Sequence, residues 1–256
     1  MASSTKNELK ENKKSGAKIA CFILLLVIIG ATTGCLFSPY FNITDIIAND
    51  YENVASGEII EVANIPIGIN IFRINDSKIE NQIESLSYVK KADVYRAFPS
   101  TIILKIEERK PYAIVKYLES FAVADKYGYI LEIKKENDLP NLPIIYGLDS
   151  ADFKVGQKLI DTSMLKYENS VYLLETAEET NFNYNFTEIN YDDSTNVKLY
   201  IKEKEIDIIY GAITIDNIEE KLSHLASILQ NLQGKEGKID MSNEDYLART
   251  VFTEKK

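Results

Sequence analysis

Hydrophobic and polar residues follow several distinct patterns along the chain, and the first of these is an uncharged run near the N-terminus. Residues 19–37 (IACFILLLVIIGATTGCLF) contain no charged side chain. As a helix this run would extend about 28 Å, close to the hydrocarbon thickness of a bilayer. Lysines crowd its N-terminal side. The positive-inside rule then predicts a cytoplasmic tail over residues 1–18, a single transmembrane helix over 19–37 and an extracytoplasmic remainder.

Two other interpretations of the same run stay open. A cleaved signal peptide also combines a basic start with an apolar stretch. A lipoprotein signal is the sharper version, because Thr32-Thr33-Gly34-Cys35 resembles a lipobox that ends on a cysteine. All three interpretations place residues 38–256 outside the cytoplasm.

Residues 41–109 show the periodicities of a small α+β unit. Alternation predicts strands and helical spacing predicts two helices, one starting at Ser56 and one at Ser77. The expected strands cover residues 41–48, 89–97 and 101–107, the last two joined by a tight turn at Phe98-Pro99-Ser100. The resulting order, β-α-α-β-β, predicts a sheet with two helices on one face.

Residues 110–256 predict a second, mixed and β-rich domain with two helices. Short strands are expected at 112–117, 121–124, 129–133, 144–147, 186–191, 197–201, 206–210 and 238–241. One helix is expected over about 163–180. The other begins at Asp216, ends near Gly234 and carries Ile218, Leu222, Leu225, Leu229 and Leu232 at helical spacing. The fold class expected for the whole chain is therefore α+β behind one membrane helix.

Composition and charge exclude several classes of function. With 45% hydrophobic residues the 256-residue chain can build a core. The net charge of the whole chain is −10. Five lysines and two glutamates give residues 1–18 a charge of +3, so the rest of the chain carries −13. Such an acidic exterior repels phosphate backbones, so no nucleic-acid partner is expected. Both cysteines lie in the apolar run, so no disulfide framework is expected outside it.

Candidate chemistry is sparse. The only histidine, His224, is expected to face solvent from the helix after Asp216, and no exterior cysteine exists. A Ser-His-Asp triad, a cysteine protease or a structural zinc site therefore lacks parts, and no phosphate loop or dinucleotide motif occurs. Carboxylate pairs for glycoside cleavage stay open, because the chain holds 39 acidic residues. We expect no enzyme activity, no catalytic residue, no cofactor, no metal and no small-molecule substrate.

The remaining candidate site is a sheet edge near the C-terminus. Residues 246–252 alternate in a way that predicts a strand with side chains on both faces. An open edge exposes backbone N–H and C=O groups to which another chain can add a strand. The candidate partner-binding residues are Tyr246, Leu247, Arg249, Val251 and Phe252. The same stretch could instead close the domain's own sheet, and both roles are compatible.

An ordered set of motifs resembles the FtsQ/DivIB family of bacterial cell-division proteins, which carry a POTRA domain followed by a β-rich domain. Residues 106–111 (IEERKP) resemble the family's ER.P junction between the two domains. The other motifs occur at 41–47, 67–72, 88–92, 96–99, 125–128, 142–147 and 237–241. The resemblance implies a POTRA domain over 41–109 and a β-rich domain with a C-terminal tail over 110–256.

The same resemblance implies a non-enzymatic, bitopic scaffold of the divisome that links septal cell-wall synthesis proteins. Its partners would be small bitopic proteins of the FtsL and FtsB/DivIC type, added by strand pairing. It would sit in the cell membrane as a single-pass type II protein at the division septum. The alternative is a POTRA-containing lipoprotein or secreted chaperone-like module for polypeptide transport or assembly, and a cell-wall hydrolase is a third, less supported class.

Overall fold

A computed structural model describes residues 21–34, 37–148, 153–180, 182–232 and 234–255 of the chain. Residues 21–34 are helical. The predicted tail over 1–18 and residues 19, 20, 35 and 36 of the predicted span lie outside the described residues. Within the described ranges, no helix combines the length and apolar character needed to cross a membrane. The chain divides into two compact units, residues 1–84 with 91–106 and residues 85–90 with 107–256, each described by itself below.

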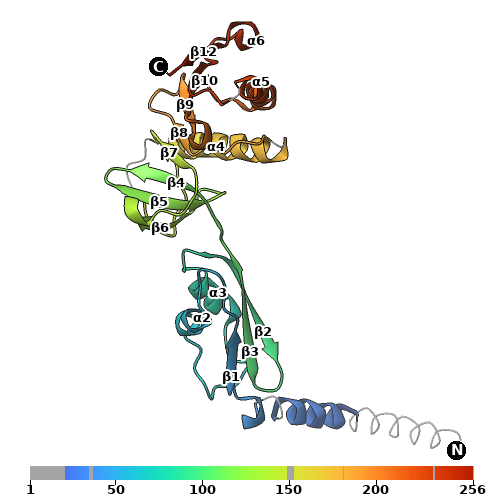
Figure 1. Ribbon diagram of the computed structural model, residues 1–256. Coiled ribbons are helices and arrows are strands. Elements are labelled where there is room, and N and C mark those ends of the chain that lie inside the picture. Colours follow the sequence, from blue (N-terminus) through green and yellow to red (C-terminus); the bar gives the residue numbers. More distant parts are fainter. Residues whose placement is uncertain (1–20, 35–36, 149–152, 181, 233, 256) are drawn as a thin grey trace, which may run out of the picture. The chain divides into compact units, whose positions relative to one another are not determined.

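The first unit follows the predicted order β-α-α-β-β. Its three-stranded sheet has the order β1-β3-β2, with β1 parallel to β3, and Figure 1 shows both helices on one face of it. The elements are η1 (Pro39–Phe41), β1 (Asp45–Ala48), α2 (Ser56–Ala63), α3 (Asp76–Ile83), β2 (Val89–Ala97) and β3 (Thr101–Glu108). The strand predicted over 41–48 is wrong in its first half, because Pro39–Phe41 turn as a 3-10 helix before β1 begins.

Local chemistry explains where the helices of the first unit begin and end. Asn75, rather than the predicted Ser77, caps α3 by accepting the Lys78 amide at 3.2 Å. Asn64 ends α2 in a left-handed conformation. The apolar stripes of both helices lie on the sheet, and their fully buried residues include Ile59 and Ile83.

The second unit is built on a nine-stranded mixed sheet with the order β12-β11-β10-β9-β8-β7-β4-β5-β6. The strands are β4 (Pro111–Tyr117), β5 (Ser120–Asp125), β6 (Ile130–Lys134), β7 (Ile144–Tyr146), β8 (Glu188–Asn190), β9 (Val197–Ile201), β10 (Ile206–Gly211), β11 (Gly237–Asp240) and β12 (Val251–Glu254). The helices are η2 (Glu136–Asp138), α4 (Asp161–Glu179), η3 (Lys202–Lys204), η4 (Ile215–Asn217), α5 (Ile218–Asn231) and α6 (Tyr246–Arg249). The expectation of two helices is therefore wrong, because the second unit contains α6 and short 3-10 helices in addition to α4 and α5.

The main core of the second unit lies between the sheet and the helices α4 and α5. Leu222, Leu225 and Leu229 of α5 are all buried in the same cluster as Ile208 and Ile239 of the sheet. These leucines repeat at three and four residues, so the predicted amphipathic stripe is the buried face. Both helices lie on the same side of the sheet in Figure 1.

A buried ion pair explains why two of the sequence motifs occur together. The Arg109 guanidinium donates to Asp125 at 2.8 Å and lies 3.7 Å over the ring of Tyr129. The other Asp125 carboxylate oxygen accepts the amides of Tyr127 and Tyr129, both at 2.9 Å. The side chains of Arg109 and Asp125 are only 11% and 4% exposed. The arginine of the IEERKP motif and the aspartate of the DKYG motif therefore form one polar centre inside the second unit.

A glycine explains a further motif. Gly147, which ends the LPIIYG stretch, has φ +74°, and a Cβ there would lie 2.5 Å from the backbone carbon of Tyr191. Only glycine combines this backbone angle with so close an approach of two chain segments.

Candidate partner-binding edge

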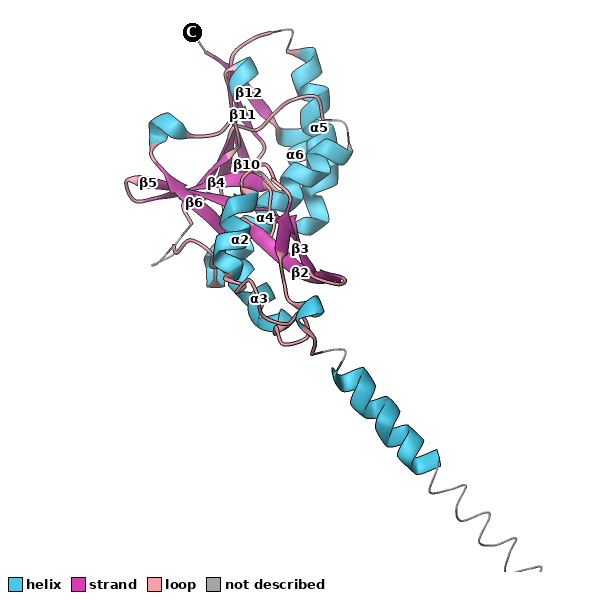
Figure 2. Ribbon diagram, turned by 90° about the horizontal axis from the view of Figure 1, so that it is seen from below, coloured by secondary structure: helices cyan, strands magenta, loops and turns pink. Residues whose placement is uncertain are grey.

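The C-terminal strand β12 forms one edge of the nine-stranded sheet. It pairs antiparallel with β11, which pairs in parallel with β10, and within the described residues no strand lies beyond β12. Figures 1 and 2 both place α5 and α6 beside this end of the sheet. The open edge predicted from the sequence is present, but it belongs to residues 251–254 alone.

The backbone groups that face the open edge can be assigned from the register. Lys255 donates its amide to the Glu236 carbonyl at 2.9 Å, and Lys238 lies opposite Thr253. Hydrogen-bonding sides alternate along an antiparallel strand. Residues 251, 253 and 255 therefore point their polar backbone groups toward β11, while Phe252 and Glu254 point theirs outward.

The seating of β12 depends on a glycine in the strand beside it. Gly237 lies opposite Glu254, and a Cβ on Gly237 would collide with the Thr253 carbonyl oxygen and lie 3.0 Å from the Glu254 Cα. The glycine of the GKIDM motif thus allows the edge strand to approach β11.

We expect Gly237→Ala to displace β12 and to lower the free energy of unfolding by about 1–3 kcal/mol, because the collision is with backbone and cannot be relieved by a rotamer change. Hydrogen exchange at the amides of residues 251, 253 and 255 would measure the loosened pairing. Gly57→Ala, where a Cβ meets nothing within 4 Å, is the matched control. Unchanged protection of those amides in Gly237→Ala would contradict this role.

The helix α6 is anchored by its first residue. Tyr246 is 8% exposed and donates its hydroxyl to Glu220 of α5 at 2.7 Å. Burial, with the hydrogen bond to Glu220, raises the pKa of Tyr246 to about 12, so this phenol remains a donor at neutral pH. Thr250 closes the turn by donating to the Tyr246 carbonyl at 2.6 Å. The strand predicted over 246–252 is therefore wrong for residues 246–249, which form a helix.

A buried lysine lies beneath this helix. Lys221 is 4% exposed, donates to the Tyr210 carbonyl at 2.8 Å, and lies 4.7 Å from the Tyr210 ring centroid and 5.0 Å from that of Tyr246. Burial lowers the pKa of Lys221, because the charged ammonium is penalised away from water. The two tyrosine rings and one carbonyl replace its lost hydration.

We expect this lysine to make stability depend on pH. Its folded pKa lies below the unfolded value, so between the two the unfolded chain binds more protons and stability rises with pH. The free energy of unfolding of Lys221→Met, relative to that of the unchanged chain, should therefore be highest at neutral pH and should fall as the pH rises toward about 10.5. Urea unfolding of both proteins at several pH values measures the difference, in which the tyrosine titrations largely cancel. A difference that does not vary with pH would contradict the shift.

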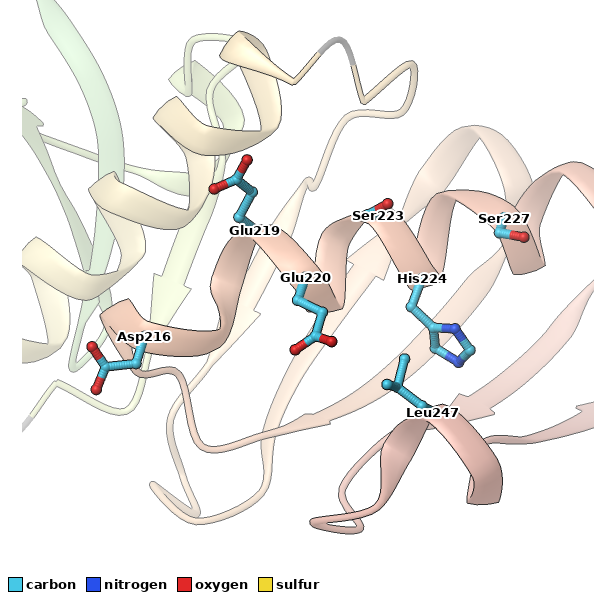
Figure 3. Close-up of a pocket in the computed structure, with 7 residues that line it drawn as sticks. All are labelled: Asp216, Glu219, Glu220, Ser223, His224, Ser227 and Leu247. Atoms are coloured by element: carbon cyan, nitrogen blue, oxygen red, sulfur yellow. The ribbon is translucent and has the colours of Figure 1, made fainter.

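A groove of about 570 Å³ runs between α5 and α6. Figure 3 shows the side chains of Glu220, His224 and Leu247 around it. The residues that line it are Asp216, Glu219, Glu220, Ser223, His224, Ser227 and Leu247. Three carboxylates and one exposed leucine suit a partner with a basic and apolar face.

The structure divides the five predicted partner-binding residues into two groups. Leu247 and Val251 are 55% and 58% exposed, and Arg249 is exposed beside Asp245. Tyr246 is buried and Phe252 is half-buried against the main core. The first three remain available to a partner, whereas the last two hold the edge in place.

Sequence reasoning missed the groove and misplaced its histidine. His224 is half-buried, with Nε2 3.3 Å from the Thr250 hydroxyl, instead of facing solvent freely. The available signal was the polar side of the helix, where Glu219, Glu220, Ser223 and Ser227 accompany His224. In the part of the chain that is described, no cluster of three or more His, Cys, Asp or Glu side chains could hold a metal ion.

Comparisons with known proteins show which proteins this chain is similar to. Residues 41–109 match the family described as "POTRA domain, FtsQ-type". The chain is 27% identical over 227 residues to the cell division protein DivIB of Clostridium tetani, covering 86% of this chain and 83% of that protein. It is 25% identical to DivIB of Bacillus subtilis (93% and 87%) and 24% identical to the cell division protein FtsQ of Syntrophotalea carbinolica (84% and 74%).

The first unit is thus a POTRA domain, and the chain is a POTRA-containing protein with a β-rich second unit. Its relatives in several bacteria are cell-division proteins, and the similarity covers most of the length of each. The chain is similar to the FtsQ/DivIB cell-division proteins over most of its length.

Proposed function

We propose that the chain is a non-enzymatic, bitopic membrane scaffold of the bacterial divisome. In this proposal it binds small bitopic partners of the FtsL and FtsB/DivIC type and links them to septal cell-wall synthesis. The observation that carries the proposal is the open edge of β12, where Phe252 and Glu254 point their backbone groups away from β11, beside the α5–α6 groove. A partner strand can extend the sheet there while its neighbouring segment lies along the groove.

The membrane anchor in this proposal rests on the apolar run at residues 19–37. Each side chain from Phe22 to Ile29 is between 50% and 61% exposed in the helix of residues 21–34. A helix that is apolar on all sides is stable where its surroundings are also apolar. The proposed topology is single-pass type II, with residues 1–18 in the cytoplasm and residues 38–256 outside, at the division septum.

The role is tested by truncation and imaging. Removing residues 251–256 deletes β12 and leaves Tyr246 in the core, so the second unit should keep its fold. We expect this truncated protein to lose capture of the partner pair in a co-purification from membranes, while a fluorescent fusion of the full chain concentrates at midcell. Capture unaffected by the truncation would refute the edge as the binding site, and a uniform membrane signal would refute the divisome role.

A further inference from the structure

Four aromatic rings gather at the end of the POTRA domain that holds η1 and the turn between β2 and β3. Phe41 lies 5.4 Å from Phe72 and 6.4 Å from Phe98, and Phe72 and Phe98 are stacked at 5.4 Å. Tyr40 meets Phe41 edge-on at 5.3 Å. Figure 1 shows the β2–β3 turn, the start of β1 and η1 at this same end. We call these four residues the aromatic patch.

The aromatic patch is exposed although its rings contact one another. Tyr40 is 69%, Phe98 58% and Phe72 39% exposed. Phenylalanine side chains are usually buried inside a domain. Exposed rings that cluster at one end therefore indicate a surface that contacts an apolar environment.

Backbone and side-chain hydrogen bonds hold the three segments of the aromatic patch in place. Ile71 donates its amide to the Phe41 carbonyl at 2.8 Å, and Thr44 donates to the Ser100 carbonyl at 2.9 Å. Arg96 of β2 donates to the Ile71 carbonyl at 3.0 Å. The buried Asn70 accepts the Phe72 amide at 3.0 Å. The ring positions are therefore set by the fold before any contact forms.

The distance along the chain limits where the aromatic patch can be. Tyr40 follows Phe37, the last residue of the apolar run, by three residues, which span at most about 11 Å when fully extended. Residues 39–41 form a 3-10 turn, which is shorter still. The polar interface of a bilayer is roughly 5–8 Å thick on each side. An anchor that ends at Phe37 therefore keeps Tyr40 and Phe41 at or near the lipid headgroups.

We infer that the aromatic patch inserts into the boundary between headgroups and acyl chains of the membrane that holds the anchor. The POTRA domain then contacts the extracytoplasmic face of this membrane through Tyr40, Phe41, Phe72 and Phe98. This inference rests on the proposed membrane anchor. Aromatic rings are favoured at this depth, and the Tyr40 hydroxyl supplies the polar tip that can remain in the headgroup layer. Arg73, exposed and next to Phe72 in sequence, can pair with lipid phosphates.

The contact is apolar in origin. Residues 19–256 carry a net charge of −13, so electrostatic attraction to an anionic lipid surface would not hold this domain down. Burial of aromatic surface depends little on ionic strength. Insertion of the aromatic patch also fixes the orientation of the POTRA domain relative to the membrane, with the rest of the domain facing the aqueous space.

The chain contains no tryptophan, which allows a direct test in the full-length protein. Phe98→Trp places the only tryptophan in the aromatic patch, within the β2–β3 turn. Tyr95→Trp places it on strand β2 before that turn, at a position that is 49% exposed and outside the patch. Both variants are reconstituted into phosphatidylcholine–phosphatidylglycerol vesicles with and without brominated acyl chains. We expect the tryptophan at 98 to emit at shorter wavelength and to be quenched several-fold more than that at 95, equally at low and high salt.

Each other outcome overturns a defined statement. Equal quenching at 98 and 95 in protein that resists alkaline extraction from the vesicles refutes the insertion and leaves the anchor standing. A blue-shifted but unquenched tryptophan at 98 shows that protein, such as a second copy of the chain, covers the aromatic patch. Protein released by alkaline extraction refutes the anchor itself, and with it this inference.

Discussion

A proline at position 254 should weaken capture of the partner pair roughly ten- to a hundredfold without unfolding the protein. The Glu254 amide points away from β11, so its loss leaves every β11–β12 hydrogen bond in place. Proline is tolerated on edge strands when its missing N–H faces solvent. An added strand, however, would find one carbonyl without a donor, which costs about 1–3 kcal/mol, and would also meet the proline ring.

The controls for Glu254→Pro separate backbone from side chain. Glu254→Ala removes the exposed ion pair with Lys235 and keeps the amide, so we expect near-normal capture. Thr253→Pro removes an amide that points toward β11 and should loosen the strand itself. Binding is measured by titrating the reconstituted protein with the purified partner pair. If Leu247→Asp abolished binding while Glu254→Pro bound normally, the groove and not the strand edge would be the main contact.

Removing the arginine of the buried pair should destabilise the second unit by about 3–5 kcal/mol. Arg109→Met keeps the length of the side chain over the Tyr129 ring but leaves the Asp125 carboxylate buried without its cation. Removing one partner of a buried pair leaves an uncompensated charge, which is why the expected loss is large. Urea unfolding followed by circular dichroism measures it.

Two further variants show whether the pair acts as a unit. Lys126→Met breaks the ion pair between Lys126 and Glu175, whose side chains are 45% and 36% exposed, and should cost less than about 1 kcal/mol. Adding Asp125→Asn to Arg109→Met removes both charges while an amide oxygen can still accept the Tyr127 and Tyr129 amides. We expect the double variant to be more stable than Arg109→Met alone. A double variant that is less stable by the sum of both single losses would show that the two residues act independently.

Periodicity predicted the elements whose residues bury one face. The helix with Leu222, Leu225 and Leu229 and the strand with Ile102, Leu104 and Ile106 were both predicted, because burial on one side imposes a repeat that can be read along the chain. The order β-α-α-β-β of the POTRA domain followed from the same repeats. Where turns are capped locally, as at Asn75, the position was wrong by one or two residues.

Residues 246–252 show where such reasoning fails. Their alternation predicted one strand, yet Tyr246–Arg249 turn as a helix, because the ring of Tyr246 packs beside Lys221 and its hydroxyl bonds to Glu220. These contacts join segments about 25 residues apart. No local periodicity records them, and four residues are too few to show a helical repeat.

The sequence by itself determined the apolar run, the negative charge of the rest of the chain, the β-α-α-β-β order of the first unit and the family motifs, all of which can be found along the chain without knowledge of the fold. Only the tertiary structure decided that the edge strand is confined to residues 251–254 and that Arg109 and Asp125 form one buried centre. It likewise decided that Glu219, His224 and Leu247 share a groove and that Phe41, Phe72 and Phe98 form one aromatic patch. The physical reason is the same in each case: these features arise from pairing between distant segments, and such pairing is fixed by how the sheet and helices pack together.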